Sequence, residues 1–294
     1  MGEAPGHTPV LMEEVLRYLN PQSNHTLLDC TCGAGGHSEA LLQSHAQVIG
    51  VDRDAHARAL ASERLSGYGA SFRIYAGTFA SAAATFIAQG QRFSGVLADL
   101  GVSSMQLDDP MRGFGIRSQA DADMRMGDEA EHDALTFIDQ CSQETLAQVL
   151  RDYGEERMAG RVARHLKEAR ARGARSAAEL ADAVRSALPG RHQRHPALRT
   201  FQALRIAVNG ELEQLRSLLD ALPDLLEDGG RAVLISFHSL EDRMVKYAFR
   251  DGRREGVYSD TARKVVTADS QEIARNRRAS SAKLRWAIRA QRCE

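Results

Sequence analysis

Residues 27–38 read L-L-D-C-T-C-G-A-G-G-H-S, and residues 48–52, V-I-G-V-D, follow after a helical stretch. The first apolar run leads into a turn with three glycines, and the second ends on Asp52. This order of strand, loop, helix and strand is typical of the start of a parallel α/β sheet that binds a nucleotide at its strand ends. A helix beginning near Gly36 would offer free N–H groups to a carboxylate or phosphate.

The glycine spacing favours one class of nucleotide over another. A dinucleotide fingerprint requires G-x-G-x-x-G, but counting from Gly33 places Ser38 at the third glycine. The stretch fits D-x-T-x-G-x-G instead, beginning at Asp29. An acid is unfavourable beside a pyrophosphate but favourable beside the ammonium or sulfonium of S-adenosylmethionine. We expect Asp52 to accept the ribose hydroxyls; the alternative is a tight turn that binds nothing.

The composition indicates a globular protein without a dominant charge. The 294 residues are 43% hydrophobic, which suffices for one large domain or two smaller ones. The net charge is -1, so any polyanion must be held by local basic patches. We find no signal peptide or membrane-spanning run and expect a cytoplasmic protein. Cys30 and Cys32 are expected to be small packed residues rather than metal ligands, so no metal is predicted.

Strands and helices alternate over the first hundred residues, which favours a parallel sheet with crossover helices. Phe79 follows the third strand, where its ring could lie against adenine or open the next helix from the core. Asp99 ends the fourth strand and is expected in the same crevice as Asp52. The expected strands are 26–31, 46–52, 71–77 and 94–99, with helices at 54–66 and 79–89.

The middle of the chain lacks strand signals. Residues 107–127 show no clear period and are expected to form a long ordered loop over the site. Within it, Phe114 could stack on a base or anchor the loop. The pattern is then helical only, which predicts an all-helical insertion at 133–199 between the two parts of an α/β domain, 1–132 and 200–294. One long helix at about 198–226 would return to the sheet.

Basic residues gather in and beside this insertion. Arg157, Arg161 and Arg164 have the spacing of one helical face. Arg194 and Arg199 follow in a second basic segment. Such a run is either a solvated face or a surface that tracks the phosphates of a nucleic acid without reading its sequence.

The fifth strand, 231–237, ends at another group of polar residues. We expect Ser239 to cap the following helix, which leaves His238 as a candidate substrate contact or catalytic group. Residues 250–283 are polar, and we expect part of them to lack regular structure, with a short strand at 262–268. Residues 283–290 alternate and are expected to close the sheet as an antiparallel strand.

The N-terminal segment H-T-P-V-L carries a helix-start signal. Thr8 is a suitable cap for the helix that follows, with proline at the first helical position. His7 lies directly before it, either as a surface residue or as a contact to substrate or cofactor.

Several motifs together resemble the MraW family of bacterial ribosomal RNA small-subunit methyltransferases, from His7 to about Arg289. They are H-T-P-V-L at 7–11, D-L-G-V-S-S-M-Q-L-D-D at 99–109, Y-G-E-E-R at 153–157, R-T-F-Q-A-L-R-I at 199–206 and I-S-F-H-S-L-E-D-R at 235–243. The resemblance implies a Rossmann-like class I methyltransferase sheet with an inserted helical domain. It also implies methylation of N4 of a cytidine in the decoding region of 16S rRNA, in a small ribosomal subunit or its precursor.

The resemblance further implies which residues hold S-adenosylmethionine. Its methionine end would lie against the glycine loop and its ribose against Asp52. Asp99 and His238 are candidates for receiving the amine proton, but D-L-G-V lacks the P-P-Y of many amino-methyltransferases, so no catalytic base is assigned. Position by position, the implied cofactor residues are Gly35, Gly36, His37, Asp52, Phe79, Asp99 and Gln106.

Other functions stay open from the sequence. An NAD-dependent oxidoreductase is opposed by the missing third glycine and by Asp29. A non-catalytic RNA-binding protein is opposed by the intact Gly35, Asp52 and Asp99. A methyltransferase acting on DNA or a free nucleoside would keep the same motifs, although the basic insertion favours a large polyanion. A homodimer and a monomer are equally compatible with the sequence.

Overall fold

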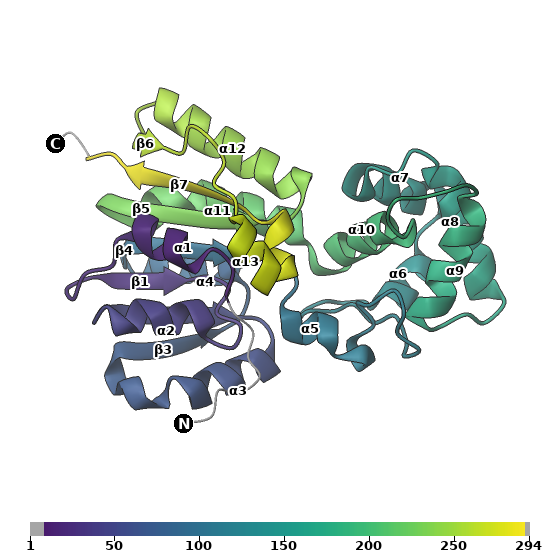
Figure 1. The fold of residues 1–294 in the computed structure, drawn as a ribbon, viewed down its shortest axis with the longest axis horizontal. Helices are drawn as coiled ribbons and strands as arrows, with labels where there is room; N and C mark the ends of the chain where they lie inside the picture. Colours follow the sequence, from purple (N-terminus) through teal and green to yellow (C-terminus); the bar gives the residue numbers. More distant parts are fainter. Residues whose placement is uncertain (1–8, 292–294) are drawn as a thin grey trace. The chain divides into compact units, whose positions relative to one another are not determined.

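The computed structural model describes residues 9–291 and divides into two compact units (Figure 1). The first, called here the sheet unit, comprises Met1–Gly101 and Leu212–Glu294, and the second, the helical unit, comprises Val102–Glu211. The helical unit is wider than the expected insertion at 133–199. The reason is that Phe114 and Met124 of the preceding loop pack into the same core as the helices. His7, Thr8 and Cys293 lie outside the described residues.

The described part of the sheet unit contains one sheet of seven strands in the order β3-β2-β1-β4-β5-β7-β6. The first five strands in this order are parallel, and β7 is antiparallel to both of its neighbours. This confirms the expected Rossmann-like α/β class and the antiparallel closing strand. The bounds are β1 Thr26–Asp29, β2 Gln47–Asp52, β3 Phe72–Ala76, β4 Phe93–Asp99, β5 Leu226–Ser236, β6 Tyr258–Thr261 and β7 Lys283–Arg289.

Helices cover both faces of this sheet because alternate strand residues point to opposite sides. Leu27 of β1 packs with α1 and α2, whereas Leu28 packs with α4, α11 and α12. The order in which strands are added to the sheet reverses between β1 and β4, so the crevice for a ligand is expected at the carboxyl ends of these two parallel strands. The helices of this unit are α1 Met12–Leu19, α2 Gly36–Gln43, α3 Ala55–Arg64, α4 Phe79–Ala88, α11 Glu211–Leu225, α12 Ser239–Arg254 and α13 Ser270–Arg275, with η1 Ser66–Ser71 and η3 Arg277–Ser281.

The helical unit has its own apolar core, built from the stripes that the sequence shows at spacings of three and four. Ser176 and Glu179 form a capping box at the start of α9: the serine hydroxyl accepts from the Glu179 N–H at 3.2 Å, and the glutamate accepts from the Ser176 N–H at 2.9 Å. The helices are α5 Ser104–Asp108, α6 Ala134–Gln140, α7 Gln143–Gly154, α8 Ala159–Ala171, α9 Ala177–Ala187 and α10 Ala197–Asn209, with η2 Pro110–Arg112.

The single long helix expected at 198–226 is wrong. The chain breaks at Gly210, whose φ of 59° ends α10, and α11 begins at the next residue. The side chain of Asn209 is buried and holds the loop beside it, donating to the Met124 carbonyl at 2.8 Å and accepting from the Met126 N–H at 2.7 Å. The Asn-Gly pair was a turn signal that the helical periodicity masked.

The end of the chain also differs from expectation. The strand expected at 262–268 is instead β6, four residues earlier, and only an isolated bridge joins Val266 to Leu284. Residues 250–283, parts of which were expected to be irregular, carry α13 and η3. In the described part of the chain, no helix has both the length and the apolar character needed to cross a bilayer.

Candidate cofactor site at the carboxyl edge of the sheet

Asp52 lies at the end of β2 and is tied to the glycine loop. Its two carboxylate oxygens accept hydrogen bonds from the backbone N–H groups of Gly33 and Asp54, each at 2.8 Å. Each oxygen retains a second lone pair, and the residue is partly exposed. The carboxylate is therefore oriented by the backbone and can still accept the hydroxyls of a sugar.

Asp29 plays a different part from the one expected. It is only 1% exposed, and its oxygens accept from the Ser38 hydroxyl at 2.7 Å and from the Thr31 N–H at 3.2 Å. Burial raises the pKa of this carboxyl. Asp29 thus joins the strand to the loop and to α2, and the suggestion that it faces the charged end of a ligand is wrong.

Asp99 and His37 meet where β4 and α2 approach each other. The Asp99 N–H donates to the Thr31 hydroxyl at 2.6 Å, and its Oδ2 lies 3.6 Å from His37 Nε2. His37 is 6% exposed, yet neither of its ring nitrogens, nor Oδ1 of Asp99, has a hydrogen-bond partner among the described residues. Buried polar atoms are normally satisfied, so these three atoms indicate a site for a polar ligand.

The loop glycines permit close approach around the start of α2. Gly35 has a φ of 82°, a conformation that disfavours other residues. A Cβ on Gly36 would lie 2.6 Å from Pro9 Cγ, so the N-terminal segment packs directly on the glycine loop. Cys30 and Cys32 are buried beneath this loop as expected for packed residues, and burial raises the pKa of both thiols well above their usual range.

The other two predicted cofactor residues, Phe79 and Gln106, have packing and capping roles in the structure. Phe79 is the first residue of α4 and packs, partly buried, against the core, which is the second of the two positions predicted for it. Gln106 belongs to the helical unit. Its Oε1 accepts from the Ser103 N–H at 3.0 Å and its Nε2 donates to the Met126 carbonyl at 3.4 Å. Gln106 thus caps α5 with Ser103 and ties it to the loop.

His238 is explained by helix capping, which was expected of Ser239. His238 is the N-cap of α12, and its Nδ1 accepts from the Glu241 N–H at 3.4 Å. Its Nε2 lies 3.1 Å from Glu241 Oε1. Nδ1 is therefore used by the cap, whereas Nε2, although close to Glu241, has no hydrogen-bond partner among the described residues.

Glu272 is a residue of this region that the sequence did not reveal. It lies on α13, and its Oε1 accepts from the Leu11 N–H at 2.7 Å, across 261 positions of sequence. Leu11 is buried with a φ of 54° and stands at the start of α1, two residues after the proline that packs on Gly36. The carboxyl-terminal part of the chain thereby holds the segment that covers the glycine loop.

We expect Glu272→Ala to lower the free energy of unfolding by about 1–2 kcal/mol, because the buried Leu11 N–H loses its acceptor. Hydrogen exchange at Leu11 should accelerate in the same variant. Glu272→Gln, which keeps an oxygen at this position, is the matched control and should restore most of the loss. Unchanged exchange in the alanine variant would show that Glu272 does not hold this segment.

The pKa of Asp52 predicts how ligand affinity responds to acid. Burial raises this pKa, and the N–H groups of Asp54 and Gly33 oppose the rise. Only the ionised carboxylate accepts two hydroxyls, so affinity should fall on acidification at a higher pH than for an ordinary aspartate, by up to about tenfold per pH unit below the pKa.

The titration of Asp52 would not reduce ligand affinity by unfolding the protein. Between the ordinary and the raised pKa the folded state binds more protons than the unfolded state, so the contribution of Asp52 to stability increases as the pH falls. Titration calorimetry between about pH 8 and pH 5 measures the effect. An affinity profile for Asp52→Asn that falls as steeply as that of the parent would assign the titration to another group.

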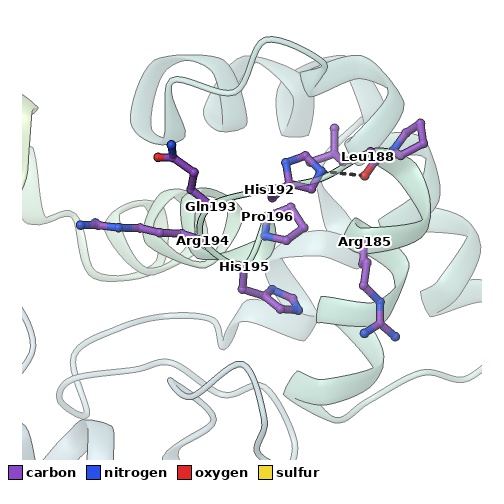
Figure 2. Close-up of a pocket in the computed structure, with 9 residues that line it drawn as sticks. Arg185, Leu188, His192, Gln193, Arg194, His195 and Pro196 are labelled. Atoms are coloured by element: carbon purple, nitrogen blue, oxygen red, sulfur yellow. Dashed lines mark hydrogen bonds between the residues drawn. The ribbon is translucent and has the colours of Figure 1, made fainter.

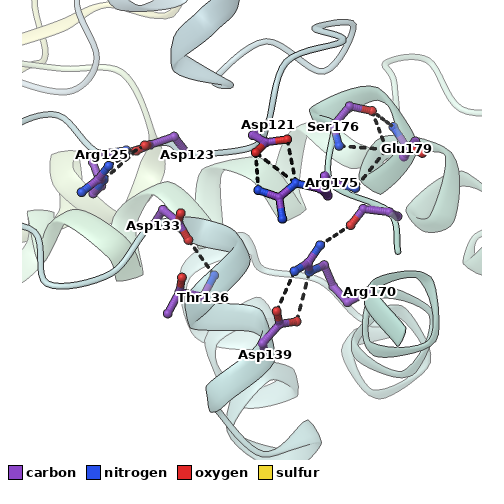
Figure 3. A network of polar contacts seen from close by, with 11 residues as sticks. Asp121, Asp123, Arg125, Asp133, Thr136, Asp139, Arg170, Arg175, Ser176 and Glu179 are labelled. Atoms are coloured by element: carbon purple, nitrogen blue, oxygen red, sulfur yellow. Dashed lines mark hydrogen bonds and ion pairs between the residues drawn. The ribbon is translucent and has the colours of Figure 1, made fainter. Parts of the chain in front are cut away.

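The basic residues of the helical unit divide into two groups. Arg170 pairs with Asp139 at 2.6 Å and Arg175 pairs with Asp121 (Figure 3). Lys167 donates to the carbonyls of Asp139 and Cys141, so these three cations are used within the unit. The cations predicted to contact substrate are all exposed; they are Arg157, Arg161, Arg164, Arg194 and Arg199. Among them, Arg157 precedes α8 rather than lying on it, because the helix begins at Ala159.

Arg194 lines a surface pocket of about 470 Å³ together with His192 and His195. Both histidines are used locally, since His192 Nε2 lies 3.0 Å from the Leu188 carbonyl and His195 Nδ1 accepts from the Ala197 N–H at 3.2 Å. Figure 2 shows that Arg185 and Arg194 point in different directions and do not converge on one point. Phe114, in contrast, is 6% exposed and lies in the core, so it anchors its loop.

The sequence of this chain matches the MraW methylase family over residues 4–290. Ribosomal RNA small subunit methyltransferase H of Anaeromyxobacter sp. (strain K) is 45% identical over 301 residues, which cover 95% of this chain and 96% of that protein. The protein of the same name from Gloeobacter violaceus is 46% identical over 286 residues, covering 96% and 88%.

Solved structures with a related fold include more distant proteins. An rRNA methylase from Streptococcus thermophilus has a TM-score of 0.44 and 11% identity, covering 95% of this chain and 94% of that one. This likeness is too weak to support a function. The match over nearly the whole chain, together with the sequence identity to full-length relatives, is decisive: the chain belongs to the MraW methylase family and is an S-adenosylmethionine-dependent methyltransferase.

Proposed function

We propose that this protein methylates N4 of a cytidine in the decoding region of 16S rRNA, in a small ribosomal subunit or its precursor. One observation carries the proposal: Asp52, Asp99 and the glycine loop meet at one edge of the sheet in a chain of the MraW methylase family. Relatives that match the full length are named as methyltransferases of small-subunit ribosomal RNA.

The residues at this edge fit the cofactor. Asp52 would accept the ribose hydroxyls, and Gly35, Gly36 and His37 would hold the methionine carboxylate at the start of α2. Phe79 packs against the core at the start of α4 with part of its surface exposed, and the family resemblance implies Gln106 as a further cofactor residue. The nitrogens of His37 and Oδ1 of Asp99 have no hydrogen-bond partner among the described residues, so a polar ligand at this edge would satisfy them.

S-adenosylmethionine supplies a methyl group on a positively charged sulfur. The exocyclic amine of cytosine is a weak nucleophile because its lone pair is delocalised into the ring, so the protein must position it and accept its proton. Good positioning contributes up to roughly 7–11 kcal/mol in favourable cases. The base must also leave its stack to reach the methyl group.

Asp99 is the better of the two candidates for the proton acceptor. Its Oδ1 has no hydrogen-bond partner among the described residues, and its backbone is fixed by Thr31. His238 is held by the helix start instead: its Nδ1 accepts from the Glu241 N–H, and its Nε2 lies 3.1 Å from Glu241 Oε1. An acceptor on the amine would localise the nitrogen lone pair as the new carbon–nitrogen bond forms.

The exposed arginines of the helical unit support a large polyanionic substrate. Arg157, Arg161 and Arg164 are accessible, although Arg164 also lies 3.7 Å from Glu168. A free nucleoside carries no phosphate that could contact such a surface, whereas a folded RNA would contact it through its phosphates. DNA is the remaining alternative substrate and is distinguished by direct assay.

Mass mapping of small-subunit rRNA from cells without this protein tests the proposal. One cytidine of the decoding region should lose one methyl group, and the parent gene should restore it while Asp52→Ala should not. An unchanged map would contradict the proposed substrate. Purified protein incubated with labelled S-adenosylmethionine and either small subunits, naked 16S rRNA or DNA would identify the form that is methylated.

A further inference from the structure

The outer face of α12 carries a stripe of cations with an aromatic ring between them, which we call the α12 stripe. Arg243, Tyr247, Arg250 and Arg254 follow one another at spacings of four, three and four, and Lys246 lies beside them. All five side chains are exposed. The opposite face of the helix is buried through Val245 and Phe249, so the orientation of the stripe toward solvent is set by the core.

Tyr247 is a large aromatic residue, yet 44% of its surface is exposed to solvent. The Arg250 guanidinium carbon lies 4.6 Å from the centre of its ring and Lys246 Nζ lies 5.9 Å from it. Such cation–π contacts keep the ring and the two charges together as one surface.

The charge of the stripe is local and positive, in a chain whose net charge is -1. Arg250 pairs with Asp251 at 2.8 Å, and Arg254 lies 3.9 Å from the same carboxylate. Glu255 adds a second negative charge at the far end. Arg243 and Lys246 lie in the half of the helix nearer its start. The two acids of that half are directed inward: Glu241 is buried, and Asp242 accepts a hydrogen bond from Arg285.

The position of α12 places one end of the stripe near the carboxyl edge of the sheet. α12 starts directly after β5, at the carboxyl edge of the sheet where Asp99 lies beside Ile235. From Arg243 to Arg254 the stripe extends about 16 Å away from that edge, at ~1.5 Å per residue. It therefore begins near the cofactor edge and follows the sheet away from it, with α12 packed on β5, β7 and β6.

We propose that the α12 stripe binds single-stranded RNA next to the nucleotide to be methylated, with phosphates on the cations and a base stacked on Tyr247. This inference rests on the proposed RNA substrate and adds a contact surface on the sheet unit. An aromatic ring between cations matches alternating bases and phosphates, whereas an acidic peptide has charges but no ring that needs the tyrosine face. The target base itself must be unpaired, so its neighbours are accessible for stacking.

The test measures binding of a fluorescent single-stranded RNA of about ten nucleotides by the full-length protein over a range of salt concentrations. Lys246→Ala/Arg250→Ala should weaken binding about fivefold or more and reduce the slope of log affinity against log salt by about 0.7 to 1.4, because each lost phosphate contact contributes about 0.7 and Arg250 is shared with Asp251. Tyr247→Ala should weaken binding about five-fold or more and leave that slope unchanged, because stacking releases no counterions.

Arg216→Ala is the matched control, since Arg216 is exposed on α11, another helix of the same unit. It should change neither affinity nor slope, and none of the variants should change the affinity for S-adenosylmethionine. Parent-like RNA binding by both α12 variants, an equal loss in Arg216→Ala, or equal competition by polyglutamate would overturn the proposal.

These outcomes are separable from the fate of the proposed function. An unchanged rRNA methylation map with RNA binding that still depends on the α12 stripe would contradict only the proposed target. A methylation map that loses one cytidine, with RNA binding that is indifferent to the stripe, would contradict only this surface.

Discussion

Asp52→Ala is expected to weaken binding of S-adenosylmethionine by at least about 100-fold. The carboxylate is held by two backbone N–H groups and would accept two ribose hydroxyls, each charge-assisted bond contributing roughly 1.5–3 kcal/mol. Tenfold in affinity corresponds to about 1.4 kcal/mol, so loss of both bonds gives at least the stated factor. Titration calorimetry measures it directly.

Asp52→Asn separates the charge from the shape of the site. The amide keeps one oxygen and the volume of the side chain, so its loss should be intermediate between that of the parent and that of the alanine variant. Both variants should fold and keep the RNA affinity of the parent, but Asp52→Ala should lower the free energy of unfolding by about 1–3 kcal/mol, because the Gly33 and Asp54 N–H groups lose their acceptors. A parent-like affinity for S-adenosylmethionine in Asp52→Ala would place the ribose elsewhere.

Reversing the charge of Arg157, Arg161 and Arg164 together is expected to reduce RNA affinity by about 100-fold at low salt. All three side chains are exposed, and the cations that stabilise the helical unit, such as Arg170 and Arg175, are left intact. Loss of up to three phosphate contacts should reduce the salt slope by about 2. Binding of S-adenosylmethionine should not change.

The control for this variant is Arg185→Glu, which reverses an exposed charge of α9 that already pairs with Asp182 at 2.8 Å. It should have little effect on RNA, because that cation is partly neutralised in the parent. If the triple variant keeps both the affinity and the salt slope of the parent, the arginines are a solvated face and the helical unit contacts RNA through other residues.

Motif and periodicity were sufficient where function depends on neighbours in sequence. The glycine loop, the strand-end acids Asp52 and Asp99 and the capping box of α9 all lie within local patterns, and the structure has them at the expected ends of strands and helices. The same patterns underlay the resemblance to the MraW family, which the match over residues 4–290 confirms.

Local patterns failed where one residue could serve two roles. His238 and Ser239 are adjacent polar residues before a helix, and only the backbone geometry shows that the histidine is the cap. Asp29 is an acid before a glycine loop, but its oxygens are bonded to Ser38 and Thr31 rather than directed toward a ligand. Phe114 lies between two glycines as an exposed base platform would, yet it packs in a core.

By itself, the sequence determined the order of strands and helices, the class of cofactor and the acids at the strand ends, because hydrophobic period and turn chemistry are local. Only the tertiary structure decided which cations remain accessible, that Asn209 holds the loop before the helices and that Glu272 holds the segment over the glycine loop. Those contacts join residues 83 to 261 positions apart, and no spacing along the chain specifies which distant donor an oxygen will meet when the core forms.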